Sequence, residues 1–145
     1  MVDVQLEKCI AFATRAHAGQ KDKGGHDYIE HPLRVMNNVE TTEQKITAVL
    51  HDILEDTWYT AGDLKRLLDI SDEIIDALKL LTRKRGENYM DYIQRLSVNP
   101  LAAAVKTADL KDNMNLDRLP EVTERDLRRC EKYREALEWL SAARG

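Results

Sequence analysis

The sequence has few cysteines, no long apolar run and no excess of basic residues, and each absence excludes a class of protein. Its two cysteines, Cys9 and Cys130, stand apart without the paired spacing of a structural metal site. We therefore expect reduced, packed thiols in a cytoplasmic protein. No basic and then apolar leader opens the chain, and the apolar run of residues 46–50 is too short to span a bilayer. We expect a soluble protein with no membrane partner.

The charge balance argues against a nucleic-acid partner. The formal net charge is −4, whereas proteins that bind nucleic acid normally present a basic surface. A small anionic substrate stays open, because a local basic rim is compatible with an acidic whole. Hydrophobic residues make up 43% of the chain and charged residues 33%, which is typical of a soluble globular protein. With 145 residues, we expect one domain over residues 1–145 with one core.

Helical periodicity runs through most of the chain, and no stretch of useful length has the pattern of a strand. Thr41 with Gln44 has capping-box spacing, and Asn99 followed by Pro100 is a strong helix start. The sequence therefore predicts an all-α helical bundle. The expected helices cover residues 3–17, a segment opening at 31–32, 41–57, 61–68, 71–81, 89–96, 99–113 and a last segment that starts near 123 and includes residue 140.

One predicted helix carries an unusual polar face. His51, Asp52, Glu55 and Asp56 fall within an arc of roughly 140° on a helical wheel, and apolar residues occupy the opposite arc. No lysine or arginine lies within this face, so its three carboxylates repel one another. A bound divalent transition metal would remove that cost, since imidazole nitrogen and carboxylate oxygen suit such ions. A solvated acidic face that happens to hold a histidine is the alternative.

Two further residues extend this hypothesis. His31 precedes Pro32 at a helix start, and a histidine held at such a rigid corner suits a metal ligand, although a surface position is more usual. Asp109 lies in a helix of small apolar residues that we expect to be buried, and a buried acid requires a partner. Lys106, one turn earlier, is one candidate partner and a metal ion is the other. Asn113 lies one turn later on the same face.

Two other stretches leave their role open. The segment of residues 20–27 is a loop by composition, and Lys21 and Lys23 with its two glycines either hold an anionic group or are mobile surface lysines. The last predicted helix has an apolar stripe with near-heptad steps. Core packing is the expected role of this stripe, and the seam of a homodimer is the alternative. The stripe comprises Leu127, Cys130, Leu137 and Leu140.

The order of these motifs resembles that of the HD-domain metal phosphohydrolases, and most closely the RelA/SpoT-type guanosine polyphosphate hydrolases. Residues 16–20 read Ala-His-Ala-Gly-Gln, and Lys23, Gly25, Tyr28 and His31-Pro32 follow, as in the opening motif of that family. Residues 51–57 read His-Asp-Ile-Leu-Glu-Asp-Thr and resemble its central motif. Residues 106–109, Lys-Thr-Ala-Asp, with Asn113 and Met114, resemble its third. The three motifs keep their order and span roughly residues 11 to 115.

The resemblance implies a compact HD-domain helical bundle and a Mn²⁺-dependent hydrolase that removes the 3′-pyrophosphate of guanosine tetra- or pentaphosphate. It implies Glu55 and Asp56 as the catalytic acids that orient or deprotonate the attacking water. The implied metal ligands are His31, His51, Asp52 and Asp109, and the implied substrate-binding residues are Lys23, Lys106 and Asn113.

The sequence departs from the family pattern at several positions. Asp22 stands where an arginine is usual and Asp27 where a proline is usual, and residues 110–112 read Leu-Lys-Asp in place of Arg-Leu-His. None of these changes removes an expected metal ligand. Asp22 places an anion beside the expected nucleotide site. Two alternatives therefore stay open: a phosphohydrolase acting on another nucleotide or dinucleotide, and a catalytically silent nucleotide-binding regulatory domain.

Overall fold

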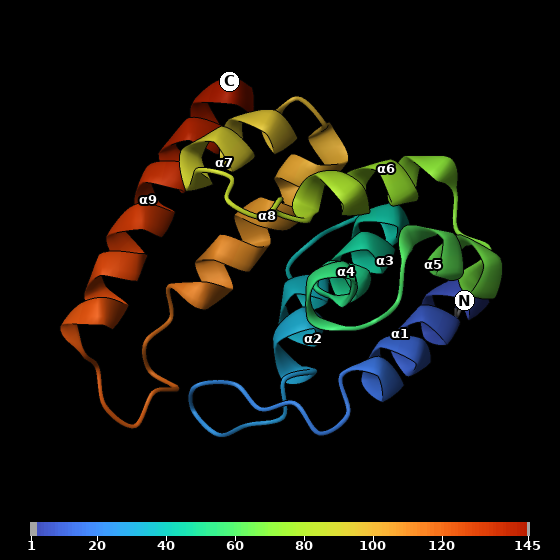
Figure 1. Cartoon of the computed structure of the whole chain (residues 1–145), viewed down its shortest axis with the longest axis horizontal. Coiled ribbons are helices and arrows are strands. Elements are labelled where there is room, and N and C mark those ends of the chain that lie inside the picture. Colours follow the sequence, from blue (N-terminus) through green and yellow to red (C-terminus); the bar gives the residue numbers. More distant parts are fainter. Residues whose placement is uncertain (1–2, 145) are drawn as a thin grey trace.

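The computed structural model describes residues 3–144, which form helices and connecting loops without a strand (Figure 1). This confirms the predicted all-α domain. None of the helices in the described part of the chain is long and apolar enough to cross a membrane. The helices are α1 (Val4–Ala16), α2 (Glu30–Asn37), α3 (Thr42–Leu50), α4 (Ile53–Asp56), α5 (Ala61–Leu68), α6 (Asp72–Leu81), α7 (Tyr89–Ser97), α8 (Pro100–Asn113) and α9 (Glu124–Arg144).

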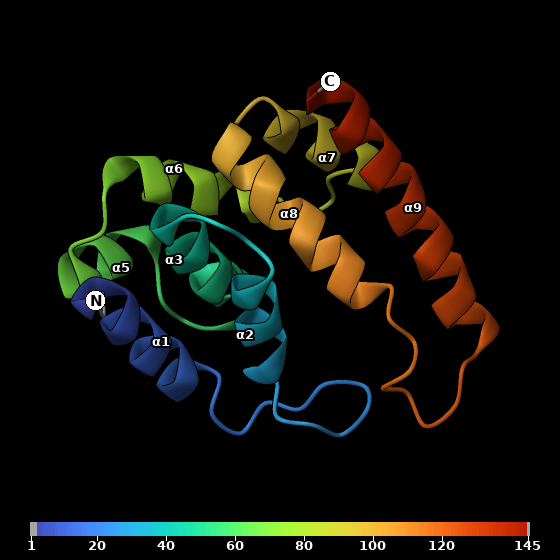
Figure 2. The ribbon, with the colours of Figure 1, turned by 180° about the vertical axis from the view of Figure 1, so that it is seen from behind.

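Helices α3 and α8 form the centre of the bundle. α3 packs against α1, α2, α6 and α8, and α8 packs against α2, α3, α6, α7 and α9. One apolar cluster joins α1, α3, α5 and α6, and a second joins α7, α8 and α9 to α2 and α6. Seen from behind, α8 runs between α2 and α3 on one side and α9 on the other (Figure 2). Any polar side chain at the junction of α2, α3 and α8 is therefore enclosed by helices.

The predicted helix starts have the expected caps. At the start of α3, the Thr41 side chain accepts the N–H of Gln44, and the Gln44 side chain accepts the N–H of Thr41. Asn99 caps α8 with Pro100 in the first position. Two starts differ from expectation by one residue. The first turn of α2 begins at Glu30 rather than His31, and α6 begins at Asp72 with Ser71 as its cap.

The single helix expected over residues 41–57 is interrupted at His51 and Asp52. His51 donates its N–H to Ala48, three residues back, where a regular α-helix would bond four residues back. Its ring Nδ1 donates to the same carbonyl at 2.5 Å, which completes the end of α3. Helix α4 then restarts when the Asp56 N–H bonds to the Asp52 carbonyl. On an unbroken helix neighbouring side chains diverge by about 100°, so this tight turn brings His51 and Asp52 together.

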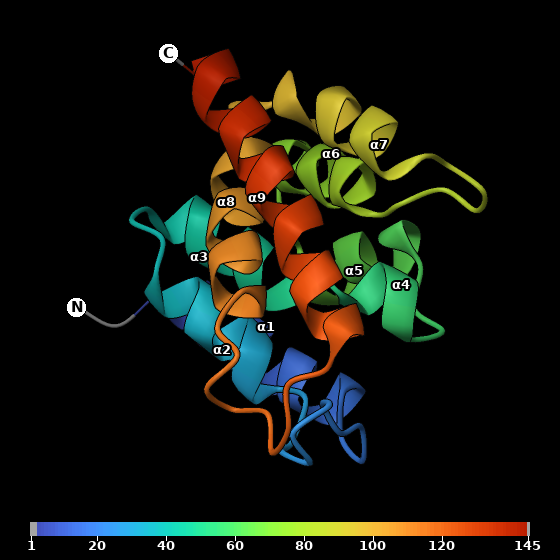
Figure 3. The same ribbon diagram turned by 90° about the vertical axis from the view of Figure 1, so that its left-hand side faces the viewer.

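The α1–α2 loop (residues 17–29) and the α8–α9 loop (residues 114–123) lie side by side (Figure 3). Their closest approach depends on Gly24. A Cβ at this position would lie 2.5 Å from the backbone oxygen of Arg118 and 3.0 Å from Nδ1 of His26. A backbone oxygen cannot yield as the end of a flexible side chain can, so only glycine fits here without a shift of one loop. Gly24 thus sets the spacing between the two loops.

We predict that Gly24→Ala lowers the free energy of unfolding by about 1–3 kcal/mol, the usual cost of an added methyl group in a filled space. Chemical denaturation measures the change. Gly62→Ala in α5 is the matched control, because the nearest atom to the added Cβ would be the Thr60 hydroxyl oxygen at 3.7 Å. An alanine in a helix is more favourable than a glycine, so Gly62→Ala should raise stability by about 0.5 kcal/mol. Equal stability of wild type and Gly24→Ala would contradict the tight approach.

Candidate metal centre and substrate cleft

Three side chains with metal-binding groups meet where the first turn of α2 faces the break between α3 and α4. His31 Nε2 lies 3.8 Å from Asp52 Oδ2, and His51 Nε2 lies 3.2 Å from the same oxygen. One ligand atom from each residue lies within 4.8 Å of the other two. Both histidines are buried, whereas Asp52 is partly exposed. The cluster is therefore enclosed on the histidine side and reaches solvent beside Asp52.

Asp109, from the middle of α8, adds a fourth predicted residue to this group. Its Oδ1 lies 2.8 Å from His31 Nε2 and 3.2 Å from His51 Nε2. Its Oδ2 accepts a hydrogen bond from the Lys106 ammonium at 2.8 Å, and Asn113 donates to Oδ1 at 3.2 Å. Asp109 is only 3% exposed. Burial alone would raise the pKa of Asp109, but the charges of Lys106 and His51 hold it well below its usual range.

Lys106 is thus the ion-pair partner expected of a buried acid. Burial would lower the pKa of Lys106, but the charge of Asp109 raises it well above its usual range. The ammonium also lies 5.2 Å from the centre of the Tyr92 ring. Lys106 does not line the cleft described below, in contrast to Lys23 and Asn113. The ammonium is therefore directed to Asp109 and the Tyr92 ring, and a role of Lys106 in substrate binding stays a prediction.

The second ring nitrogen of each histidine is already bound. Nδ1 of His51 donates to the carbonyl of Ala48, and Nδ1 of His31 donates to Asp112 Oδ2 at 2.6 Å. These bonds fix both rings with Nε2 toward Asp109, which is the arrangement that metal-binding histidines usually have. Burial lowers the pKa of His31, but its hydrogen bonds to Asp109 and Asp112 outweigh burial and raise it to about 10.

The donor set fits a divalent metal ion. Two imidazole nitrogens converge with carboxylate oxygens on two sides, and this combination suits transition metals. A cation would take the place of the protons that Nε2 of each ring now shares with Asp109. The residues that would hold it are His31, His51, Asp52 and Asp109, the four that the sequence predicts.

The two predicted catalytic acids lie in different surroundings. Partial burial and the negative charges of Asp52 and Glu55 raise the pKa of Asp56 to about 6. Tyr28 ties this region to the cluster, because its hydroxyl donates to Asp52 Oδ2 at 2.5 Å. Both acids reach solvent, and Glu55 accepts the backbone N–H of Arg83 at 2.6 Å, at the turn between α6 and α7. The structure therefore places Asp56 in the electric field of the cluster and directs Glu55 toward the basic turn.

A cleft of about 360 Å³ lies beside His31, between the α1–α2 loop and the α8–α9 loop. Its lining includes the predicted substrate-binding residues Lys23 and Asn113. Burial and the nearby charge of Arg129 lower the pKa of Lys23, as expected where cations gather. The volume falls within the usual range for sites of small ligands. The cleft therefore places a cationic lining next to the metal-binding cluster.

Three arginines of this lining were missed from the sequence: Arg34, Arg118 and Arg129. Arg34 carried a usable signal, because it lies three residues after His31 and helical residues so spaced share a face. Arg118 and Arg129 come from the α8–α9 loop and α9, and no local pattern connects them with His31. Only the folding of α9 back along α8 brings them to the cleft.

Asp22 lines the same cleft and has a structural role that its charge alone did not predict. Its Oδ1 accepts the backbone N–H groups of Gly24 and His26, both at 2.9 Å. Such bonds from an aspartate to nearby backbone hold a tight loop. The α1–α2 loop thus uses Asp22 to keep Gly24 against Arg118.

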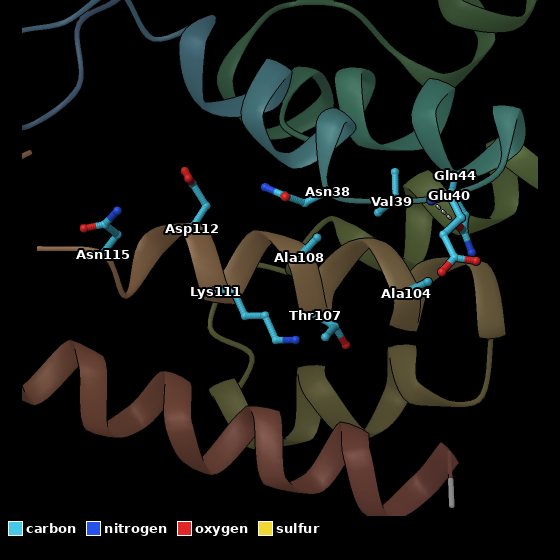
Figure 4. A pocket seen from close by; sticks show the side chains of 10 residues that line it. All are labelled: Asn38, Val39, Glu40, Gln44, Ala104, Thr107, Ala108, Lys111, Asp112 and Asn115. Atoms are coloured by element: carbon cyan, nitrogen blue, oxygen red, sulfur yellow. Dashed lines mark hydrogen bonds between the residues drawn. The ribbon is translucent and has the colours of Figure 1, made fainter. Parts of the chain in front are cut away.

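A second hollow of about 600 Å³ lies between the α2–α3 connection and α8 (Figure 4). Asn38, Glu40 and Gln44 line it from one side, and Thr107 and Lys111 line it from α8. Its lining contains none of the four predicted metal ligands. The hollow shares Asp112 and Asn115 with the cleft, but His31 lines only the cleft. The candidate site is therefore the cleft and not this hollow.

We predict that Lys106→Met lowers the free energy of unfolding of metal-free protein by about 3 kcal/mol, because loss of one partner leaves the Asp109 charge buried. Urea denaturation in the presence of a chelator measures it. Lys111→Met on the exposed side of the same helix is the control, and we expect a change within about 0.5 kcal/mol. Equal effects of the two substitutions would contradict the buried ion pair.

Comparison with known proteins finds relatives of this chain. No family model matches the chain. A probable GTP pyrophosphokinase of Mycobacterium leprae is 30% identical over 151 residues, which cover 94% of this chain and 18% of that protein. The guanosine-3′,5′-bis(diphosphate) 3′-pyrophosphohydrolase of Haemophilus influenzae is 33% identical over 116 residues, which cover 71% of this chain and 17% of that protein. The chain thus spans less than a fifth of the length of these relatives.

The fold comparison extends over the whole chain. The structure of a metazoan ortholog of SpoT that hydrolyses ppGpp matches with a TM-score of 0.75 at 17% sequence identity. The match covers 100% of this chain and 98% of that chain. At this identity the likeness shows the fold, and the sequence matches come from RelA/SpoT-type proteins. The resemblance that the three motifs predict is therefore confirmed, and the chain is an HD-type helical domain of the RelA/SpoT kind.

Proposed function

We propose that this protein is a metal-dependent phosphohydrolase that removes the 3′-pyrophosphate from guanosine tetra- or pentaphosphate. One observation carries the proposal: the cluster of His31, His51, Asp52 and Asp109 adjoins a cleft lined by cations. The names of relatives as ppGpp hydrolases support the same substrate class. A solvated acidic face would need neither the buried histidines nor the cationic cleft.

His31, His51, Asp52 and Asp109 would hold the metal ion, and Mn²⁺ is the ion that the resemblance implies. When bound, such an ion lowers the pKa of a water molecule and neutralises charge on a phosphate. Lys106 holds Asp109 ionised and fixed through its Oδ2, so that Oδ1 stays directed to the histidines. Tyr28 fixes Asp52 in the same way from the other side.

The cleft would bind the substrate through its phosphates and its ribose. The lining holds five cations and three carboxylates, and guanidinium groups suit phosphate oxygens. The cations are Lys21, Lys23, Arg34, Arg118 and Arg129, and the carboxylates are Asp22, Asp112 and Asp126. Asn113 lines the cleft and also donates to Asp109, so its amide lies between the cleft and the cluster. By resemblance, it is the residue that would contact the ribose.

Asp56 is the better placed of the two acids for proton transfer. With a pKa raised to about 6, its carboxylate is a stronger base than an ordinary aspartate and is largely ionised near neutral pH. Glu55 would act beside it by fixing the position of the water or of the α6–α7 turn, since its carboxylate accepts the Arg83 N–H. Both remain proposed catalytic residues.

A second candidate is an HD-type hydrolase acting on a less charged nucleotide. Asp22 favours it, because its carboxylate lies in the lining of the cleft and repels phosphate. Its Oδ1 is occupied by loop N–H groups, but its negative charge remains. The two candidates share the metal centre and differ in the substrate that the cleft accepts.

We predict that the Mn²⁺-loaded protein converts guanosine tetraphosphate to GDP and pyrophosphate. Asp56→Asn and Glu55→Gln should lower kcat on the order of 10²-fold if the two acids act in proton transfer. Chromatography of the nucleotides and a pyrophosphate assay measure both results. A parallel panel of phosphorylated nucleotides tests the second candidate.

The controls separate chemistry from metal binding. Elemental analysis should find the metal retained in Asp56→Asn and Glu55→Gln and lost in His51→Ala. Glu73→Gln, an exposed acid on α6, should keep full activity. No hydrolysis of guanosine tetraphosphate by metal-loaded wild type would refute the proposed function, whereas unchanged kcat in both acid variants would refute only their roles.

We predict that Asp22→Asn lowers KM for guanosine tetraphosphate several-fold, since a close charge contact at a partly exposed site is worth about 1 kcal/mol. The asparagine retains an oxygen that can accept the N–H groups of Gly24 and His26, so the loop should keep its shape. High salt should reduce the effect, because exposed charges are screened. Kinetics at low and high salt measure it. Equal KM values for wild type and Asp22→Asn at both salt concentrations would show that the charge of Asp22 does not act on the substrate.

A further inference from the structure

Asp112 occupies a position where this chain departs from the related motif, and it contacts both the metal cluster and the cleft. It lies three residues after Asp109 on α8, and its side chain is 7% exposed. Oδ2 accepts the Nδ1–H of His31 at 2.6 Å. Arg34 donates to both oxygens, Nε to Oδ1 at 2.9 Å and Nη2 to Oδ2 at 3.2 Å. Arg118 lies 3.3 Å from Oδ1 and donates to the Asp112 carbonyl at 2.8 Å.

The arginines hold the Asp112 carboxylate in place, and the carboxylate in turn holds His31. The two-pronged bond from Arg34 restricts the rotation of the carboxylate, and Arg118 holds it from the other loop. An ionised carboxylate in one orientation is an acceptor that holds an imidazole Nδ1–H in one direction.

We infer that Asp112 is a positioning residue that orients His31 for the metal, and that it joins the cationic lining of the cleft to the metal centre. The inference rests on the metal centre of the proposed function. Without Asp112, the His31 ring would lose its bond at Nδ1, and only the contact of Nε2 with Asp109 and the packing of the Tyr28 and His51 rings would orient it. His51 has no such dependence, because its Nδ1 is held by the backbone carbonyl of Ala48.

The experiment compares the Kd for Mn²⁺ of wild type, Asp112→Asn and Asp112→Ala by titration calorimetry. Loss of a residue that orients a metal-binding histidine typically weakens metal affinity 10–100-fold, and we expect Asp112→Ala to show a loss of this size. Asp112→Asn should lose less, because its amide oxygen still accepts the His31 proton. Circular dichroism verifies folding, and Asp112→Asn decides the question if the alanine variant is unfolded.

Asp126→Asn is the matched control. Asp126 lines the same cleft, but its carboxylate bonds to Thr123 and Arg129 rather than to a histidine. It should therefore leave the Kd for Mn²⁺ unchanged. Excess Mn²⁺ should restore most of the kcat of Asp112→Asn, as expected of a residue that acts through metal binding.

Two outcomes would overturn the inference. The first is a Kd for Mn²⁺ that is the same in wild type and both Asp112 variants while KM rises, which would make Asp112 only an anchor for Arg34 and Arg118. The second is a Kd for Mn²⁺ that rises equally in Asp112→Asn and Asp126→Asn, which would show that loss of any negative charge near the cleft weakens metal binding. Absence of Mn²⁺ binding by wild type would instead refute the metal centre itself and the inference with it.

Discussion

The buried carboxylate of Asp109 is the constraint on which the arrangement of the helices depends. A charge taken out of water costs several kcal/mol unless partners surround it. Its partners come from three places: His31 from α2, His51 from the end of α3, and Lys106 one turn earlier on α8 itself. The two histidines therefore link α2 and the end of α3 to α8, whereas Lys106 neutralises Asp109 from within α8. The packing of these helices therefore depends on the bonds to Asp109, and the packing in turn brings the residues of the site together.

The break between α3 and α4 lets two adjacent residues, His51 and Asp52, direct their side chains to the same metal-binding cluster. Adjacent residues on a regular helix diverge, and their side chains cannot meet. The turn is stabilised by the His51 ring itself, which donates to the same Ala48 carbonyl that accepts the His51 backbone N–H. The same bond leaves only Nε2 for the cluster. One hydrogen bond thus ends a helix and orients a candidate ligand.

Local signals in the sequence were enough for most of the fold and for the cluster. The helix starts at Thr41 and Asn99 follow from capping chemistry, and the need of Asp109 for a partner follows from burial. The break at His51 was missed, because the apolar periodicity continues through it and only a side-chain bond to the backbone interrupts the helix. Arg118 and Arg129 were missed for a different reason: their position depends on how α9 packs, which no local pattern records.

The position of Asp112 shows how the two parts of the site depend on each other. Arg34 and Arg118 line the cleft, and both donate hydrogen bonds to Asp112, which in turn accepts a hydrogen bond from His31. A phosphate that enters the cleft offers these guanidinium groups competing oxygens. Any shift of Arg34 toward phosphate would change the hold of Asp112 on the His31 ring. With substrate and metal bound as proposed, Asp112 would couple substrate binding to the geometry of the metal centre, and this coupling would act in both directions because it is a free energy shared by the two sites.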